Sequence, residues 1–137
     1  LLGAEIKNPF ARFGGKYVGW TGKFKFPVLL SSAVKTLNKK LKTKCKILGF
    51  GPIKIKTVAA CSGGAGSAIF YEALDKKVDL YVSGEPADVY TSAKEAKINV
   101  IFAGHYATET VGVRALMKVV NKKFKVKTVF IDDPTGL

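Results

Sequence analysis

The chain has 137 residues, 47% of them hydrophobic, which suits one domain with a substantial core. Its 23 lysines and arginines against 10 acids give a formal net charge of +13, which favours an anionic partner. No apolar run approaches the roughly 20 residues of a membrane helix, and two cysteines are too few for a disulfide framework, so we expect a cytoplasmic protein with reduced thiols.

The first part of the chain predicts one strand followed by one helix. Residues 16–26 alternate in a way that predicts a strand with Val18, Trp20 and Phe24 on its buried face. Pro27 suits the first turn of a helix, where a backbone N–H is not needed. Apolar residues at helical spacing predict the helix itself, namely Val28, Leu30, Ala33, Val34, Leu37 and Leu41.

From residue 45 onward, strand and helix patterns alternate. Strands are predicted at residues 45–50, 53–61, 78–82, 98–103 and 125–131. Helices are predicted at residues 68–74, at 88–97 with Asp88 as the N-cap, and at 110–124. This order predicts an α/β fold with a mixed, mostly parallel sheet and helices on its faces. Ligands collect at the carboxyl ends of the strands in such sheets, where the loops 62–67, 83–88 and 104–109 would converge.

The glycine-rich loop at residues 62–67 has two interpretations. It joins a strand to a helix N-terminus, so free backbone amides there could hold a phosphate. The residues that would do so are Ser62, Gly63, Gly64 and Gly66. The loop matches neither GxxxxGK[ST] nor GxGxxG, and its glycines could instead allow a close approach to a neighbouring backbone.

Glu85 follows a predicted strand directly, and a buried glutamate without a partner would be costly. Glu85 could hydrogen-bond to a residue that binds a metal, carry a proton in catalysis, or interact with the dipole of the helix that begins near Asp88.

His105 is the only histidine, and Glu109 lies four residues later in the sequence GHYATE. Imidazole and carboxylate are good ligands for Zn²⁺, Fe²⁺ or Mn²⁺, so the pair is a candidate half of a metal site. A lone histidine is also common as a structural residue. Other acids that could contribute are Asp79, Asp88, Asp132 and Asp133, none of which has a diagnostic spacing.

The positive charge is concentrated at the beginning of the chain. Residues 1–60 carry 13 lysines and arginines and one acid, whereas residues 61–137 carry 10 and nine. A basic first part suggests binding to DNA, RNA, a nucleotide or phosphate, mainly through phosphate groups. The alternative is a solvated lysine face, because 21 of the basic residues are lysines, which lack the planar fork of arginine.

Several blocks of the sequence resemble, in order, the Nif-three-like family, often labelled GTP cyclohydrolase 1 type 2 homolog. The blocks lie at residues 15–19, 58–66, 81–85, 103–109 and 130–134. Lys16 stands where the family usually has arginine. The resemblance covers nearly the whole chain and implies that residues 1–137 form the carboxyl-terminal part of a longer protein. The chain does not begin with methionine, so we also expect that its true N-terminus is absent.

The resemblance implies a site for two divalent metal ions (Zn, Fe or Mn), with His105 and Glu109 as ligands and the others supplied by an amino-terminal half. It also implies a homohexameric ring and metal-dependent hydrolysis of a nucleotide or phosphorylated small molecule, with Glu85 as a proton carrier. Many members have a histidine shortly after the position of Glu85; this chain has residues 86–90 (PADVY) there, where Asp88 could partly substitute. The alternative is a hexameric nucleic-acid-binding protein without catalysis.

Overall fold

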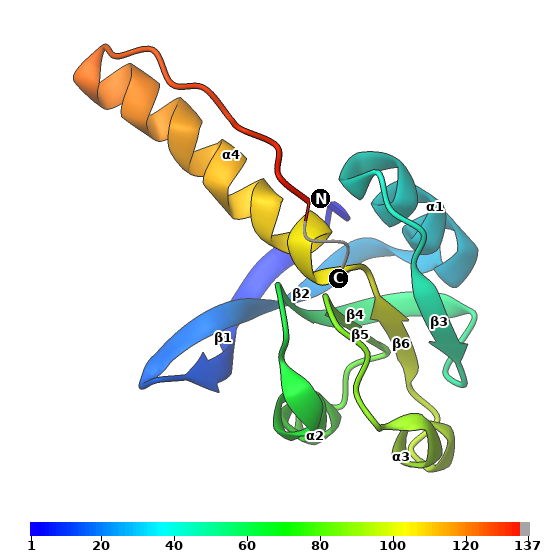
Figure 1. Ribbon diagram of the computed structural model, residues 1–137. Helices are drawn as coiled ribbons and strands as arrows, with labels where there is room; N and C mark the ends of the chain where they lie inside the picture. Colours follow the sequence, from blue (N-terminus) through cyan, green and yellow to red (C-terminus); the bar gives the residue numbers. More distant parts are fainter. Residues whose placement is uncertain (135–137) are drawn as a thin grey trace.

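A mixed sheet of six strands forms the centre of the computed structural model, which describes residues 1–134 (Figure 1). The strands are β1 (Glu5–Phe13), β2 (Lys16–Leu29), β3 (Lys46–Gly49), β4 (Lys54–Cys61), β5 (Leu80–Ser83) and β6 (Asn99–Phe102). Their order across the sheet is β1-β2-β4-β5-β6-β3. The α/β class and the mixed sheet are confirmed. Parallel pairing is confined to the centre, β4–β5 and β5–β6, while β1–β2, β2–β4 and β3–β6 are antiparallel.

Helices cover both faces of the sheet. They are α1 (Leu30–Leu41), α2 (Gly66–Asp75), α3 (Tyr90–Glu95) and α4 (His105–Phe124). Figure 1 shows α1 and α4 on one face and α2 and α3 on the other. Each face has its own apolar cluster: Leu37 of α1 packs with Ile55 and Leu80, whereas Phe70 of α2 packs with Phe10 and Tyr81. These two cores hold the three central strands in register.

The beginning of the chain differs from the expectation. The strand β1 has no clear alternation, because a register shift interrupts its pairing with β2 between Ile6 and Pro9. Pro27 lies within β2 rather than in a helix, since β2 has an irregularity between Lys23 and Val28 that removes Pro27 from the ladder. A proline is tolerated there because it has no ladder bond to make.

Val18 and Trp20 are not buried as expected. Each side chain is 52% exposed, whereas Phe24 is buried. Val18 and Trp20 lie on the α1 and α4 face and line an apolar pocket of about 380 Å³ together with Leu37 and Val111. Within residues 1–134, α1 and α4 do not close over this part of the sheet, which leaves both side chains accessible.

The last part of the chain also differs from the expectation. The helix α4 begins at His105, five residues earlier than expected, and α3 begins after Val89 without a side-chain cap from Asp88. Residues 125–131, expected as a strand, have no strand partner among residues 1–134 and run back along α4 (Figure 1). Among residues 1–134, no helix is both long and apolar enough to cross a membrane. Of the two free cysteines, Cys61 is buried and Cys45 is half-buried.

Candidate metal centre

The carboxyl ends of three neighbouring strands meet at the candidate site. The loops after β4, β5 and β6 are joined by backbone hydrogen bonds, because Gly84 N donates to Gly63 O (3.0 Å) and Gly104 N donates to Gly84 O (2.9 Å). The parallel register of these strands therefore brings together the loops that the sequence placed at strand ends.

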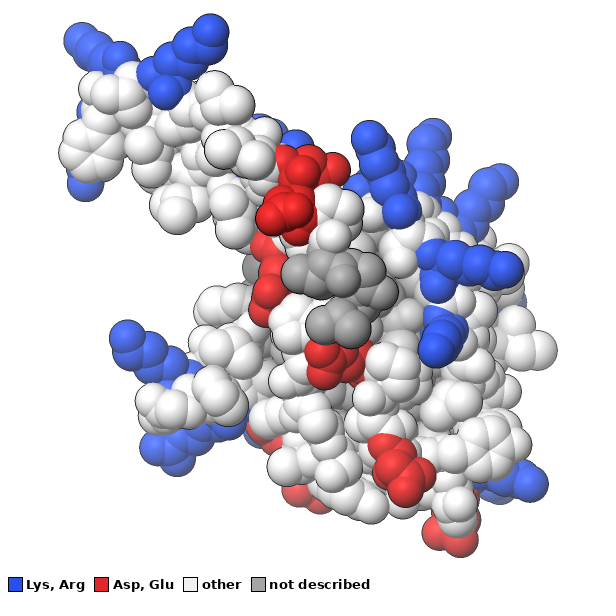
Figure 2. Space-filling model, in the orientation of Figure 1, with Lys and Arg blue, Asp and Glu red and all other residues white. Residues whose placement is uncertain are grey.

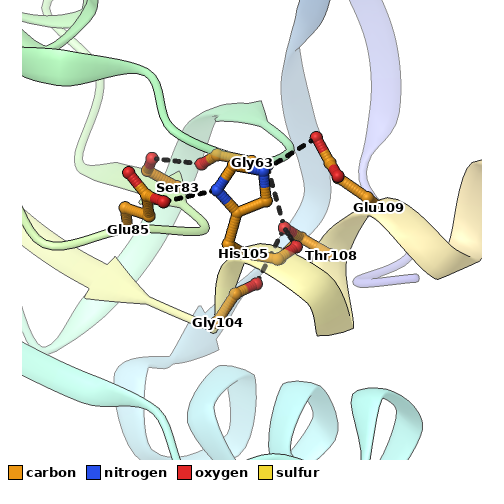
Figure 3. Close-up of polar contacts among 7 residues, drawn as sticks. All are labelled: Gly63, Ser83, Glu85, Gly104, His105, Thr108 and Glu109. Carbon is orange, nitrogen blue, oxygen red and sulfur yellow. Dashed lines mark hydrogen bonds and ion pairs between the residues drawn. The ribbon is translucent and has the colours of Figure 1, made fainter. Parts of the chain in front are cut away.

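His105 lies between two glutamates (Figure 3). Its Nδ1 is 2.5 Å from Glu85 Oε1, and its Nε2 is 3.1 Å from Glu109 Oε1. Because α4 begins at His105, Glu109 is one helical turn further along the same face. Gly104, with φ of 88°, makes the turn from β6 into the helix, a conformation that suits glycine.

Two glycines of the loop after β4 face these side chains. A Cβ on Gly63 would lie 2.5 Å from Glu109 Oε1 and 3.2 Å from His105 Nε2. A Cβ on Gly64 would lie 2.5 Å from Glu85 Oε2. Both glycines therefore allow a close approach, but to side chains of the cluster and not to a neighbouring backbone, as the sequence interpretation had it.

Phosphate binding by this loop remains a prediction. Ser62, Gly64 and Gly66 are exposed to solvent. The Gly63 amide is already used, because it donates to Thr108 Oγ1 at 3.0 Å.

Thr108 is a site residue that the sequence analysis did not identify. Its hydroxyl accepts the Gly63 N–H and lies 2.9 Å from Gly104 O, so it ties the loop after β4 to the first turn of α4 (Figure 3). The sequence signal for Thr108 is a threonine four residues after Gly104, the residue that precedes the helix, because a hydroxyl at this spacing can donate a hydrogen bond to the glycine carbonyl.

The carboxylate of Glu85 accepts a hydrogen bond from His105 and thereby raises the pKa of the imidazole above its ordinary value. Partial desolvation acts in the opposite direction and lowers this pKa, whereas the negative charge of Glu109 raises it further. In the neutral imidazole with its proton on Nδ1, that proton would point to Glu85 and the lone pair of Nε2 would face Glu109 and be available to a metal ion. A carboxylate behind a histidine is the usual means of orienting an imidazole for a metal.

We expect Glu85→Gln to lower the pKa of His105 toward the ordinary imidazole value of about 6.5. The change removes the largest contribution that stabilises the imidazolium. NMR titration of the histidine ring in metal-free protein measures the shift. Glu109→Gln should give a smaller decrease, and an equal or larger decrease with Glu109→Gln would contradict the assignment.

The spacing of the two donor atoms fits a shared metal ion. Donors bound to one ion at about 2.1 Å lie roughly 3.0–3.4 Å apart, depending on the angle between them. The 3.1 Å between His105 Nε2 and Glu109 Oε1 falls in this range. Residues 1–134 contain no group of three histidine, cysteine, aspartate or glutamate side chains that could hold a metal. His105 and Glu109 would therefore need further ligands to complete a metal site.

The other acids named from the sequence have different surroundings. Asp79 accepts hydrogen bonds from the hydroxyl and N–H of Thr57, at 3.1 and 2.9 Å, and so ties β4 to β5. Asp132 accepts a hydrogen bond from the Tyr106 hydroxyl at 2.8 Å, and Asp88 is exposed.

The fold and the site define an α/β protein with a glutamate–histidine–glutamate cluster at the carboxyl edge of its parallel strands. The model of the family Duf34/NIF3 (NGG1p interacting factor 3) matches residues 1–135, and the chain belongs to this family.

Named relatives agree with this assignment. A protein of Pyrococcus horikoshii called "GTP cyclohydrolase 1 type 2 homolog" is 45% identical over 139 residues, which cover 100% of this chain and 55% of that protein. A protein of the same name from Archaeoglobus fulgidus is 39% identical over 99% of this chain and 54% of its own length. The chain thus spans about half the length of these curated relatives.

Among solved structures, protein ybgI, described as of unknown function, superposes with a TM-score of 0.84. It is 28% identical, and the match covers 98% of this chain and 53% of that one.

Proposed function

We propose that this chain contributes to a metal-dependent hydrolytic centre that acts on a nucleotide or another phosphorylated small molecule. We base this on the 3.1 Å between His105 Nε2 and Glu109 Oε1, with Glu85 holding the opposite nitrogen of the same ring. The name of the relatives, "GTP cyclohydrolase 1 type 2 homolog", suggests the nucleotide class.

His105 and Glu109 would hold metal, and a bound divalent ion would supply an acidified water at neutral pH. Glu85 keeps the proton on Nδ1, so that Nε2 stays an acceptor. Its second oxygen faces the exposed Gly64, and from there Glu85 would accept or return a proton during hydrolysis. The exposed amides of Ser62, Gly64 and Gly66, before and at the start of α2, would hold a phosphate group.

We further propose that the complete centre holds two divalent ions, Zn²⁺, Fe²⁺ or Mn²⁺, with ligands from outside this chain. Two protein donors are fewer than the three of a typical catalytic zinc site. The relatives are almost twice as long as the matched region, which leaves room for further ligands.

The test is hydrolysis of GTP and simple phosphate esters by the full-length protein with each of the three metals. We expect metal-dependent product release that falls at least about 100-fold in Glu85→Gln, since general acid–base groups contribute that much or more. The matched control is Glu95→Gln, at the end of α3. Lack of hydrolysis with every metal, or equal activity in Glu85→Gln and Glu95→Gln, would contradict the proposal.

A second candidate function is binding to the phosphate backbone of DNA or RNA. Residues 6–71 contain 13 lysines and arginines and no acid. Figure 2 shows lysines gathered over α1, whereas acidic side chains lie near the centre of this face. Among residues 1–134, Lys35 and Lys39 of α1 form no ion pair.

We expect nucleic-acid affinity to fall steeply with salt, and Lys35→Ala/Lys39→Ala to reduce the slope of log affinity against log salt by about 2 for duplex DNA. Lys76→Ala/Lys94→Ala, on the α2 and α3 face, is the control with the same change of charge. Fluorescence anisotropy at several salt concentrations measures both. Affinity that does not vary with salt would identify the lysines as a solvated face.

A further inference from the structure

The apolar pocket that contains Trp20 lies beside the candidate metal centre, on the face of the sheet that carries α1 and α4. Its volume of about 380 Å³ falls within the range of roughly 300–1,000 Å³ that is typical of small-molecule sites. Its walls come from β2, β4, α1 and the first turns of α4. A hollow bounded by several elements differs from a flat apolar face, because a small ligand can bury most of its surface there.

The pocket exists because small residues surround Trp20 on the sheet. Trp20 pairs with Ala60 of β4, and residues that pair across two strands place their side chains on the same face. Gly22, two residues further along β2, belongs to this face as well and has no side chain. The indole of Trp20 therefore has open space beside it, and the residue is 52% exposed although β2 is paired with a strand on each side.

The pocket and the cluster share a wall. Among residues 1–134, no side chain that lines the pocket carries a charge, so the pocket suits a neutral, largely apolar group. Ser62 and Thr108 are two of its polar lining residues. Ser62 directly precedes Gly63, and Thr108 directly precedes Glu109 and accepts the Gly63 N–H at 3.0 Å (Figure 3). A ligand in the pocket would therefore reach the metal centre past Ser62 and Thr108.

A nucleotide has two parts that match these two neighbouring regions, a flat uncharged base and a charged phosphate. An aromatic side chain with open space beside it is a stacking surface for a base, because every base has a π face. The loop at residues 62–67, whose exposed amides suit a phosphate, begins at Ser62 in the wall of the pocket. A purely apolar ligand would leave this loop unused, and a free phosphate would leave the pocket unused.

We propose that the pocket binds the base of the substrate, with the ring stacked on Trp20 and the phosphate directed past Ser62 toward the cluster. This inference rests on the proposed function, and it selects a nucleotide over other phosphorylated small molecules as the substrate class. Trp20 is then a specificity-determining residue, which favours substrates with an aromatic ring over those with a sugar alone. It touches the base and not the metal ligands, so its loss weakens nucleotide binding and leaves the metal site intact.

Calorimetric titration of metal-free, full-length protein with guanosine 5′-monophosphate tests the pocket without requiring hydrolysis. Trp20→Ala should weaken binding about 5- to 150-fold, which corresponds to the loss of one base-stacking side chain, whereas Trp20→Phe keeps a ring and should weaken it less than about 5-fold. The matched control is Phe26→Ala, an aromatic residue of the same strand that is 72% exposed and does not line the pocket. Ribose 5-phosphate has no base, so the unmodified protein and Trp20→Ala should bind it equally.

Equal affinity of Trp20→Ala and Phe26→Ala for guanosine 5′-monophosphate would overturn the proposal, and so would an equal loss of ribose 5-phosphate binding in Trp20→Ala. A second measurement needs no alanine variant: guanosine 5′-monophosphate should quench the fluorescence that the unmodified protein emits in excess of Trp20→Phe. Absence of this quenching would mean that another part of the polypeptide fills the pocket, and would also overturn the proposal.

The pocket and the hydrolytic centre can fail separately. Binding that depends on Trp20 without hydrolysis would support the pocket and contradict the proposed function. Hydrolysis of GTP below its KM at the same rate in Trp20→Ala and the unmodified protein would support the proposed function and contradict the pocket.

Discussion

Replacing His105 with alanine is expected to lower the metal affinity of the full-length protein by more than about 100-fold. Mutating a residue that only hydrogen-bonds to a metal ligand already lowers affinity by about 10- to 100-fold, and loss of a ligand itself should cost more. The change removes Nε2, the atom 3.1 Å from Glu109 Oε1, and leaves Glu109 without the donor that would share the proposed ion. Elemental analysis after dialysis against a weak chelator measures the result.

Tyr106→Phe is the matched control for this variant. Tyr106 is next to His105 in α4, and its hydroxyl bonds to Asp132 and to the N–H of Asp133 rather than to the cluster. We expect Tyr106→Phe to retain metal. Equal metal content in His105→Ala and the unmodified protein would exclude His105 as a ligand.

Gly63→Ala is expected to lower metal affinity about 10- to 100-fold, whereas Gly66→Ala leaves it close to normal. The two glycines have nearly the same backbone conformation, with φ of 66° and 63°. Only at Gly63 would a Cβ meet Glu109 Oε1 and His105 Nε2, at 2.5 and 3.2 Å, and it would meet no atom within 4 Å at Gly66. Glu109 ends in a flexible carboxylate, so it would move away and leave its ligand position.

Both alanine variants carry the same backbone cost, about 1–2 kcal/mol for a left-handed residue with a side chain. Thermal denaturation should therefore show similar losses of stability for Gly63→Ala and Gly66→Ala, while calorimetric titration with metal separates them. Equal metal affinity in the two variants would mean that the loop after β4 does not lie against the ligands in the working protein.

The central βαβ part of the fold could be predicted from sequence because its signals are local. The strand at residues 53–61 is a continuous apolar run, the helices repeat apolar residues at helical spacing, and the glycine loop marks the turn between strand and helix. The structure has β4, α2, β5, α3 and β6 in that order. β1 could not be predicted from a period, because Pro9, a register shift and the positive φ of Ala11 interrupt it. Residues 125–131 show the opposite case: the strand pattern is present, but a strand also needs a partner, which residues 1–134 do not supply.

The candidate site could be predicted in composition but not in arrangement. The spacing of His105 and Glu109 suggested a pair, and the start of α4 at His105 places both on one helix face. For Glu85, the sequence left three roles open; the short contact with His105 Nδ1 favours orientation of the imidazole, and the role in proton transfer stays a proposal. That contact spans 20 residues of sequence and two strand ends, so no local pattern could reveal it.

The central claim is that His105 and Glu109 share a metal ion. Crystals of the full-length protein, measured at the absorption edges of zinc, iron and manganese, test it most directly. We predict an anomalous peak about 2.0–2.2 Å from both His105 Nε2 and a Glu109 carboxylate oxygen, with Glu85 still bonded to Nδ1. A metal bound elsewhere in the protein, with neither residue within coordinating distance, would contradict the account.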